Sequence, residues 1–376
     1  MWQPTIEHRP SDLRSSSLEY RMRFLIIRLS SIGDIVHALP AVSWLAKTFP
    51  EAEIDWVVEK RFAVLLQGNP YVRRVIGLDT LGWRKRLVSL ATLQEVRLGV
   101  ASLREAAYDT AVDFQGLYKS AVIAWLSRSR YRLGFAANWL REPAAGIFYD
   151  ERVAPHGRHH VIEWNFALVE PLGVRTPEVD QWEFPLLRTE ADDGYVAGRL
   201  ASFGAKEYIV VNPGGGWQSK RWAPENFAEL IRRLALEVGS KIFLTGSPEE
   251  ERLIHEIIRL SGSAEAHYFP STLVQFIALA RRARLFIGGD TGPLHLAAAV
   301  GTPIVAIFAT TDPLNTAERN GPFLSEDVVI TNGGRERSAR RVRAARYIEG
   351  VSVEAVLAAT RERLARLRQF GARTHG

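Results

Sequence analysis

Residues 286–308 read FIGGDTGPLHLAAAVGTPIVAIF, and this stretch decides the fold class. An apolar run ends at Gly288–Gly289, and a helix is predicted to begin near Pro293, because proline fits the first turn of a helix, where its missing N–H costs nothing. Gly301 ends that helix before a second apolar run at Ile304–Phe308. A strand, a glycine loop, a helix and another strand in this order are typical of a parallel α/β sheet.

The same alternation recurs along the whole chain. Residues 23–29 (RFLIIRL) predict a buried strand, and a helix is expected from Asp34 to Lys47. Residues 208–211 (YIVV) predict a strand that the loop NPGGGWQSK (212–220) joins to a helix at 224–238. Further strand-like runs are Glu53–Val58, Arg74–Leu78, Thr110–Asp113, Lys241–Thr245 and Leu285–Ile287. Alternating strands and helices indicate parallel sheets with helices on both faces.

Three prolines, Pro171, Pro177 and Pro185, interrupt this pattern, and the break between two α/β domains is expected near them. The expected parts are a disordered extension at residues 1–21, an N-terminal domain at 22–185, a C-terminal domain at 186–350, and a helix at 351–376 that packs back toward the N-terminal domain. Open α/β domains bind ligands at the carboxyl ends of their strands. Two facing domains are therefore expected to share a ligand cleft.

The composition is that of a globular protein. Of 376 residues, 47% are hydrophobic and 24% are charged, which excludes a disordered chain, a collagen and a coiled coil. The chain has no cysteine, so disulfides, cysteine-based zinc sites and thiol nucleophiles are excluded. The net charge of +6 suits anionic partners, and no apolar run reaches the ~18 residues of a membrane span. An arginine-rich run at 335–346 is either a solvated face or a contact to an anionic membrane.

Two loops of the second half are candidate anion sites. At residues 290–295 (DTGPLH), the amides of Thr291 and Gly292 point out of a predicted helix N-terminus, which favours a phosphate. Asp290 would repel a phosphate, so it either binds sugar hydroxyls or caps the helix, and His295 lies one turn further along. In the other loop, Gly215 and Gly216 let the backbone wrap a ligand, and Lys220 or Arg221 can reach a diphosphate.

Other candidates have more than one interpretation. Asp34 stands at the mouth of the first helix, where it is either an N-terminal cap or a general base. Glu249, Glu250 and Glu251 follow a strand end and either favour a helix N-terminus or hold ribose hydroxyls. His156, His159 and His160 lack a carboxylate at ligand spacing, so no metal is expected there.

Four motifs in this order resemble one known family. RFLIIRLSSIGDIVHALPAVSWL, YDTAVDFQGLYKSA, NPGGGWQSKRWAPENF and GGDTGPLHLAAAVGTPIVAIF are similar to segments of the ADP-heptose:lipopolysaccharide heptosyltransferases, glycosyltransferase family 9. The resemblance runs from residue 22 to about residue 322. It implies the GT-B fold, with the acceptor on the N-terminal domain and the nucleotide sugar on the C-terminal domain.

The resemblance also implies an inverting transfer of heptose from ADP-L-glycero-D-manno-heptose to Kdo of Kdo2-lipid A. It implies that Asp34 is the general base and that Lys220 contacts the ADP diphosphate. The implied nucleotide-sugar residues are Gly215, Gly216, Lys220, Glu249, Asp290, Thr291, Gly292 and His295. The implied acceptor residues are Arg84, Lys85, Lys119 and Arg141. No cofactor or metal is implied. The partners would be ADP-heptose, Kdo-lipid A and the cytoplasmic face of the inner membrane of a Gram-negative bacterium, without nucleic acid.

Some positions depart from the family pattern. The loop before Lys220 carries three consecutive glycines in place of hydroxyl-bearing residues, so its phosphate contacts would come from backbone amides. Leu81 and Gly82 stand where basic residues are more usual, which leaves the acceptor open. The alternatives are a member with another nucleotide sugar or acceptor, a nucleotide-sugar epimerase of similar shape, and a non-catalytic nucleotide-binding module.

Overall fold

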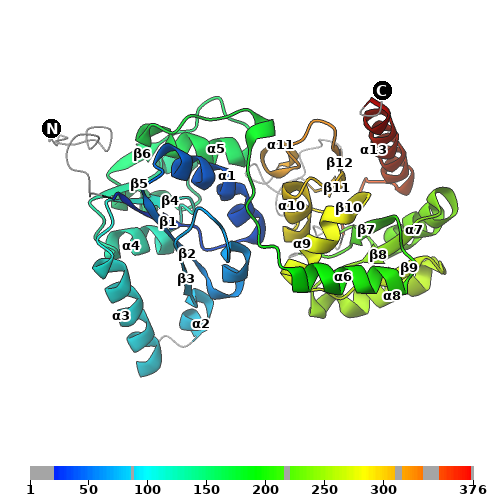
Figure 1. The fold of residues 1–376 in the computed structure, drawn as a ribbon, viewed down its shortest axis with the longest axis horizontal. Helices are drawn as coiled ribbons and strands as arrows, with labels where there is room; N and C mark the ends of the chain where they lie inside the picture. The colour runs from blue at the N-terminus through cyan, green and yellow to red at the C-terminus, as the bar shows by residue number, and fades with distance from the viewer. Residues whose placement is uncertain (1–20, 86–88, 216–220, 310–315, 333–346, 374–376) are drawn as a thin grey trace. The chain divides into compact units, whose positions relative to one another are not determined.

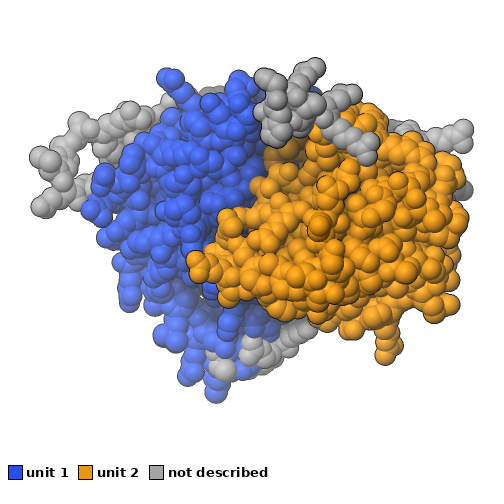
Figure 2. Space-filling view, turned by 45° about the vertical axis from the view of Figure 1, so that its right-hand side comes forward, with its two compact units in different colours: residues 1–186 blue, residues 187–376 orange. Residues whose placement is uncertain are grey.

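The computed structural model describes residues 21–85, 89–215, 221–309, 316–332 and 347–373. The chain forms two units, residues 1–186 and 187–376, which Figure 2 colours separately. The division lies next to the expected boundary between residues 185 and 186. The expected extension at 1–21 falls, except for Arg21, outside the described residues, as does the arginine run at 335–346.

The first unit is a six-stranded parallel sheet in the order β3-β2-β1-β4-β5-β6. Its strands are β1 (Arg23–Ile27), β2 (Glu53–Glu59), β3 (Arg74–Leu78), β4 (Thr110–Asp113), β5 (Tyr131–Phe135) and β6 (Glu151–Val153). Its helices are α1 (Ile32–Thr48), α2 (Thr80–Lys85), α3 (Leu90–Glu105), α4 (Tyr118–Leu126) and α5 (Val161–Val169). Helix α1 packs with α5, and α3 packs with α4 (Figure 1).

The second unit repeats this topology in the order β12-β11-β10-β7-β8-β9, again parallel. Its strands are β7 (Tyr208–Asn212), β8 (Lys241–Leu244), β9 (Ala266–Tyr268), β10 (Leu285–Gly289), β11 (Ile304–Phe308) and β12 (Val328–Thr331). Its helices are α6 (Glu190–Ser202), α7 (Pro224–Val238), α8 (Glu251–Ser261), α9 (Leu273–Arg282), α10 (Gly292–Ala299), α11 (Ala317–Asn320) and α13 (Val353–Arg373).

The central strands are buried along nearly their whole length, as expected for parallel sheets that helices cover on both faces. Four of the five residues of β1 and all five of β7 and β11 are buried. In each unit the strand order reverses direction beside the first strand, between β1 and β4 and between β7 and β10. Such a switch point leaves a crevice at the carboxyl ends of the two strands, where open α/β sheets bind ligands.

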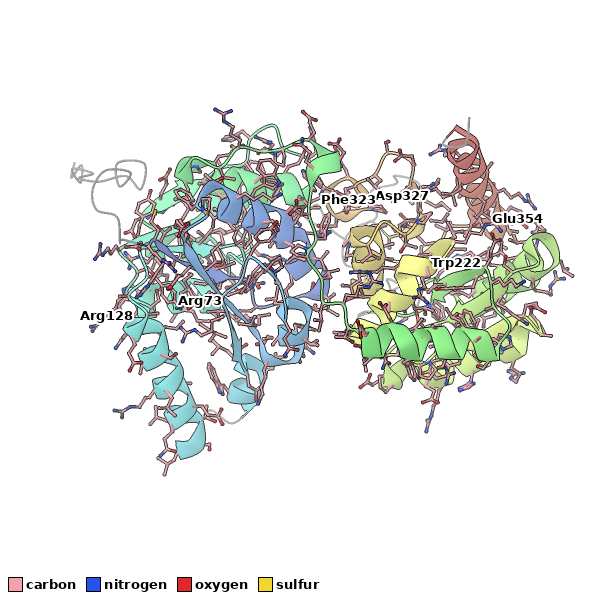
Figure 3. All side chains as sticks on the ribbon, in the orientation of Figure 1. Arg73, Arg128, Trp222, Phe323, Asp327 and Glu354 are labelled. Atoms are coloured by element: carbon pink, nitrogen blue, oxygen red, sulfur yellow. The ribbon has the colours of Figure 1, made fainter. Side chains whose placement is uncertain are left out.

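The C-terminal helix α13 packs on the second unit, against α7, β11 and β12. The expectation that it packs toward the N-terminal domain is therefore wrong. Its apolar side chains Val356 and Leu357 are fully buried in the core of the second unit. Arg363 pairs with Asp327 beside β12, and Glu354 pairs with Arg233 on α7; Asp327 and Glu354 are labelled in Figure 3. These contacts fix the helix to the sheet that precedes it in sequence.

Candidate functional site

Asp34 lies in the first turn of α1, directly after the loop that follows β1. The backbone N–H and the hydroxyl of Ser31 both donate to its Oδ2, at 2.8 and 2.9 Å. Its other oxygen pairs with the guanidinium of Arg28, a side chain that is 9% exposed. Ser31 is thus the N-cap of α1, and Asp34 is the third helical residue, which completes a capping box and is not itself the cap. The carboxylate nevertheless keeps 36% of its side-chain surface exposed, so it can also reach a ligand.

The loop after β4 clamps the loop after β1 across the switch point. The side-chain oxygen of Gln115 accepts the N–H groups of Leu29 and Ser30, at 3.0 and 3.1 Å. Arg28 donates to the carbonyl of Phe114, which fixes the cation that faces Asp34. The sequence motif containing Gln115 was recognised, but no role was predicted for Gln115 or Arg28. Both act through backbone carbonyls and amides, whose positions the sequence pattern does not show.

Asp113, the last residue of β4, organises that same loop from inside. It is completely buried and accepts the N–H groups of Gln115 and Gly116 at 2.8 and 3.2 Å, and the Tyr149 hydroxyl at 2.7 Å. Burial raises the pKa of the Asp113 carboxyl above its usual range, although these donors oppose the change. Because Asp113 binds the backbone of this loop, it fixes the position of Gln115.

The predicted acceptor residues gather on the elements beside this loop. Lys119 is exposed in the first turn of α4, and its Nζ lies 3.5 Å from the hydroxyl of Thr80, the first residue of α2. Helix α2 carries Arg84 and Lys85, whose side chains lie outside the described part of the structure. Arg141 is exposed, and the neighbouring Glu142 accepts the N–H of Tyr118 at 2.6 Å. The structure thus brings α2, the start of α4 and the Arg141 loop together.

In the second unit, the loops after β7 and β10 meet at the other switch point. Asn212 ends β7, and the hydroxyl of Thr291 lies 3.4 Å from its side-chain oxygen. The side-chain NH₂ group of Asn212 also donates to the carbonyl of Thr245 at 2.8 Å, which links the loop after β8 to this switch point. Asn212 is a buried residue of the quoted glycine motif for which no role was predicted.

Asp290, Thr291, Gly292 and His295 lie together around the start of α10, as the DTGPLH motif predicts. Thr291 occupies the N-cap position and Gly292 is the first helical residue, so the helix N-terminus opens at the end of β10. His295 Nε2 lies 3.4 Å from Asp290 Oδ1, and both side chains are more than nine-tenths buried. A carboxylate, an imidazole and the N-terminus of a helix therefore lie together at one edge of the sheet.

The glycine-rich loop is held by Glu250, the middle residue of the three-glutamate run. Its Oε1 accepts the N–H of Gly215 at 3.0 Å, and its Oε2 accepts the N–H of Ser247 at 2.9 Å. Arg221 donates twice to the Gly215 carbonyl, at 2.9 and 2.7 Å. Gly214 leaves room for this carboxylate, because a Cβ there would overlap it. The predicted contacts of Gly216 and Lys220 lie outside the described residues.

Glu249 differs from its neighbour because its carboxylate is exposed. Its own backbone N–H and the Ser247 side chain lower the pKa of this carboxyl, so it stays ionised. Of the three glutamates, Glu250 already binds the loop and Glu251 lies 3.6 Å from His255. Glu249 thus remains the predicted ribose ligand of the three.

Two further features lie apart from these loops. A cavity of about 580 Å³ in the first unit lies between α5 and residues 174–182, and none of the predicted site residues lines it. Within the described ranges, no cluster of three or more His, Asp or Glu side chains is arranged to hold a metal ion. The expectation of a metal-free site stays a prediction.

Known proteins resemble the chain in both sequence and structure. Residues 97–348 match glycosyltransferase family 9 (heptosyltransferase). Lipopolysaccharide heptosyltransferase 1 of Pseudomonas aeruginosa is 32% identical over 78% of this chain and 80% of its own length, and that of Escherichia coli K12 is 30% identical over 78% and 89%. The E. coli heptosyltransferase WaaC with ADP has 27% identity and a TM-score of 0.74, covering 91% of this chain and 100% of its own. The predicted fold class, a GT-B pair of Rossmann-like domains, is confirmed.

Proposed function

Because the chain belongs to glycosyltransferase family 9 (heptosyltransferase), we propose that it transfers heptose from ADP-heptose to Kdo of the lipopolysaccharide inner core. This is the reaction of a heptosyltransferase I. The observation that carries the proposal is the likeness to proteins named lipopolysaccharide heptosyltransferase 1, together with the likeness to WaaC structures titled with ADP and with ADP-2-deoxy-2-fluoro heptose.

The first unit supplies the groups that an acceptor needs. In the proposed inverting step, the Kdo hydroxyl oxygen forms a bond to the anomeric carbon of heptose, and the bond from that carbon to the ADP oxygen breaks. Asp34 takes the hydroxyl proton. Ser31 and Arg28 hold the carboxylate in place, and 36% of its side-chain surface stays exposed to a substrate. Lys119 and Arg141, with Arg84 and Lys85, would pair with the carboxylates and phosphates of Kdo-lipid A.

The second unit supplies the groups that the donor needs. The amides at the start of α10 favour a diphosphate, and the Gly215 loop lets the backbone approach it closely. Lys220 would add a positive charge to the departing ADP. His295 and Asp290 would orient the heptose, and Glu249 would accept the ribose hydroxyls. No residue of this set requires a metal or a cofactor.

The proposed setting of the reaction is the inner membrane of a Gram-negative bacterium, with the enzyme peripheral on its cytoplasmic face. None of the helices that the structure describes is long and apolar enough to cross a membrane. The acceptor Kdo-lipid A is itself a membrane lipid, so the enzyme must work at a lipid surface.

The test measures ADP release from ADP-heptose with and without Kdo2-lipid A. We expect ADP release to require the acceptor. We expect no turnover when UDP-hexoses replace ADP-heptose as the donor. Asp34→Asn should lose turnover while ADP binding is retained. Glu163→Gln is the matched control, because Glu163 occupies the corresponding capping position of α5 and accepts the N–H groups of His159 and His160, both at 2.9 Å. Wild-type turnover in Asp34→Asn would exclude Asp34 as the general base. ADP release without an acceptor would indicate an epimerase or a hydrolase.

A further inference from the structure

Large apolar side chains are exposed on one part of the first unit. Among the described residues, eleven large hydrophobic side chains are exposed, and seven of them belong to α2, α3, α4 and the 3₁₀ turn Pro143–Phe148. They are Leu81, Leu90, Leu93, Leu98, Tyr118, Trp125 and Ile147, with exposed fractions from 40% to 79%. Single exposed leucines are ordinary, whereas a group of this size marks an interaction surface.

Helix α3 carries three of these side chains on its outer face, and its N-terminal end extends from the body of the unit (Figure 1). Leu90, Leu93 and Leu98 are 79%, 55% and 71% exposed. At about 100° per residue, Arg97 and Arg104 lie between Leu90 and Leu93, and Leu98 lies about 80° from Leu90 on its other side. We call these five residues the α3 stripe. The fold does not require the stripe to be apolar, because α3 packs on the unit through its opposite side, where Thr92 and Leu103 are buried.

An aromatic patch continues the α3 stripe on α4. Tyr118 and Trp125 contact the ring of Phe148, with centroids 5.4 and 6.3 Å apart, and Ile147 beside it is 69% exposed. The stripe leads to this patch, because Arg104 donates to the carbonyl of Leu126, next to Trp125, at 3.0 Å. We call Tyr118, Trp125, Ile147 and Phe148 the aromatic patch.

Basic side chains accompany both surfaces. Arg97 and Arg104 are exposed within the α3 stripe, and Arg128 and Arg130 are exposed just after Trp125. Arg128 lies at the edge of the first unit (Figure 3). Two acidic residues also lie on α3: Glu95 accepts the indole N–H of Trp83 of α2 at 2.8 Å, and Glu105 is exposed beside Arg104 at the end of the helix.

We propose that the α3 stripe and the aromatic patch dock this protein on an anionic lipid bilayer. Leucines that enter the acyl boundary, Trp and Tyr at headgroup level and arginines that pair with lipid phosphates are the features of an interfacial helix. A second copy of the chain fits less well, because a two-fold contact through the α3 stripe would bring arginines of both copies together. The inference deepens the proposed function and rests on it, since a membrane-embedded acceptor explains why the surface adjoins Lys119.

The docking test uses the full chain and vesicles of phosphatidylethanolamine with phosphatidylglycerol, and phosphatidylcholine vesicles for comparison. Replacing Leu90, Leu93 and Leu98 together by serine should weaken the partition of the protein onto the anionic vesicles about tenfold or more. The control is Leu236→Ser, since Leu236 is 78% exposed on α7 of the second unit. Vesicle binding equal in the triple variant and the control would overturn the proposal.

A charge variant tests the arginines in the same assay. Arg97→Gln should weaken partition about fivefold at low salt, and added salt should remove most of that difference. Arg252→Gln, on the exposed face of α8, is its control and should leave partition unchanged. Circular dichroism of each variant verifies folding. A triple variant that changes the protein from dimer to monomer without changing vesicle binding would assign the surface to a second copy, and the proposal would be wrong.

Activity measurements separate this inference from the proposed function. With Kdo2-lipid A in vesicles, the triple leucine variant should show a raised KM and an unchanged kcat. With a water-soluble, deacylated Kdo acceptor, it should equal the wild type. If the wild type transfers heptose to neither acceptor, the proposed function fails, while vesicle binding still decides the docking surface. If the triple variant loses activity equally on both acceptors, the α3 stripe acts on catalysis and the docking proposal is wrong.

Discussion

Asp327 offers a test of how burial and pairing compete in the second unit. Its side chain is 1% exposed, and its Oδ1 accepts the Ile304 N–H at 2.9 Å and the Arg363 Nε–H at 3.1 Å. Its Oδ2 is buried, without a hydrogen-bond partner among the described residues. Burial raises the pKa of this carboxyl from 3.8 to about 6, because the cost of desolvating the charge exceeds the attraction of Arg363.

The sign and size of the effect follow from this pKa. A carboxyl whose pKa is raised in the folded state binds its proton more tightly there than in the unfolded chain. The contribution of this carboxyl to the free energy of unfolding therefore decreases as the pH rises from 3.8 to about 6. At 1.36 kcal/mol for each pH unit, the loss is about 3 kcal/mol, and it is complete by neutral pH.

Asp327→Asn removes the charge and keeps the shape. Relative to wild type, we expect the variant to gain about 3 kcal/mol in free energy of unfolding between about pH 4 and about pH 7. The assay is urea-dependent hydrogen exchange of a peptide from β11, which reports on the unit that contains Asp327. Glu354→Gln on α13 is the control, because Glu354 pairs with Arg233 at 3.0 Å but is 73% exposed. Its difference from wild type should stay within about 1 kcal/mol at every pH.

The opposite slope would refute the reasoning. If Asp327→Asn loses stability relative to wild type as the pH rises, the ion pair with Arg363 outweighs the desolvation of the carboxylate. The pair would then stabilise the attachment of α13, whereas the reasoning above assigns it a net cost that apolar packing of the helix offsets.

Three further variants test the loops of the two switch points. Gln115→Ala removes the side-chain oxygen that accepts the N–H groups of Leu29 and Ser30. It should lower kcat about tenfold or more in steady-state kinetics and leave ADP affinity, measured by calorimetry, unchanged. Gly214→Ala should push the Glu250 carboxylate off the glycine loop and weaken ADP binding about tenfold; Gly198→Ala, where a Cβ meets nothing within 4 Å, is its control. Thr291→Val loses the hydrogen bond to the end of β7 and should weaken ADP-heptose binding about two- to tenfold in a calorimetric titration; unchanged affinity would separate this loop from the donor.

The strands that could be predicted most closely from the sequence are those with an uninterrupted apolar run. Strands β1, β7 and β11 have such a run, and their predicted bounds lie within a few residues of the ends in the structure. Strands β6 and β9 have three residues each and carry charged or aromatic side chains, so they show no apolar run. Pairing with a neighbouring strand defines them: β9 pairs with β8, which the sequence does predict, and β6 pairs with β5, which it does not.

The candidate site divides in the same way. Asp290, Thr291 and His295 could be predicted to lie together, because strand–loop–helix order alone puts them at one helix start. Arg28, Gln115 and Glu250 could not, because their contacts join loops far apart in the sequence. The attachment of α13 was predicted wrongly for a related reason. Its amphipathic pattern shows that one face is buried, but the pattern carries no information on which sheet receives that face.

The two units share a topology, so we expect the proposed difference between their substrates to depend on their switch-point loops. In the first unit the loop after β1 carries a charged pair, Asp34 and Arg28, and it is closed by Gln115. The exposed carboxylate of Asp34 repels a diphosphate. The same carboxylate can accept a proton from a hydroxyl. In the second unit the corresponding loop after β7 carries glycines, and its carboxylate, Glu250, already accepts two backbone N–H groups. At the neighbouring strand end, the start of α10 offers a helix N-terminus to an anion, beside the buried pair of Asp290 and His295. Because a nucleotide diphosphate is the more negatively charged substrate at the reacting centre, this contrast favours the second unit for the donor and the first for the acceptor.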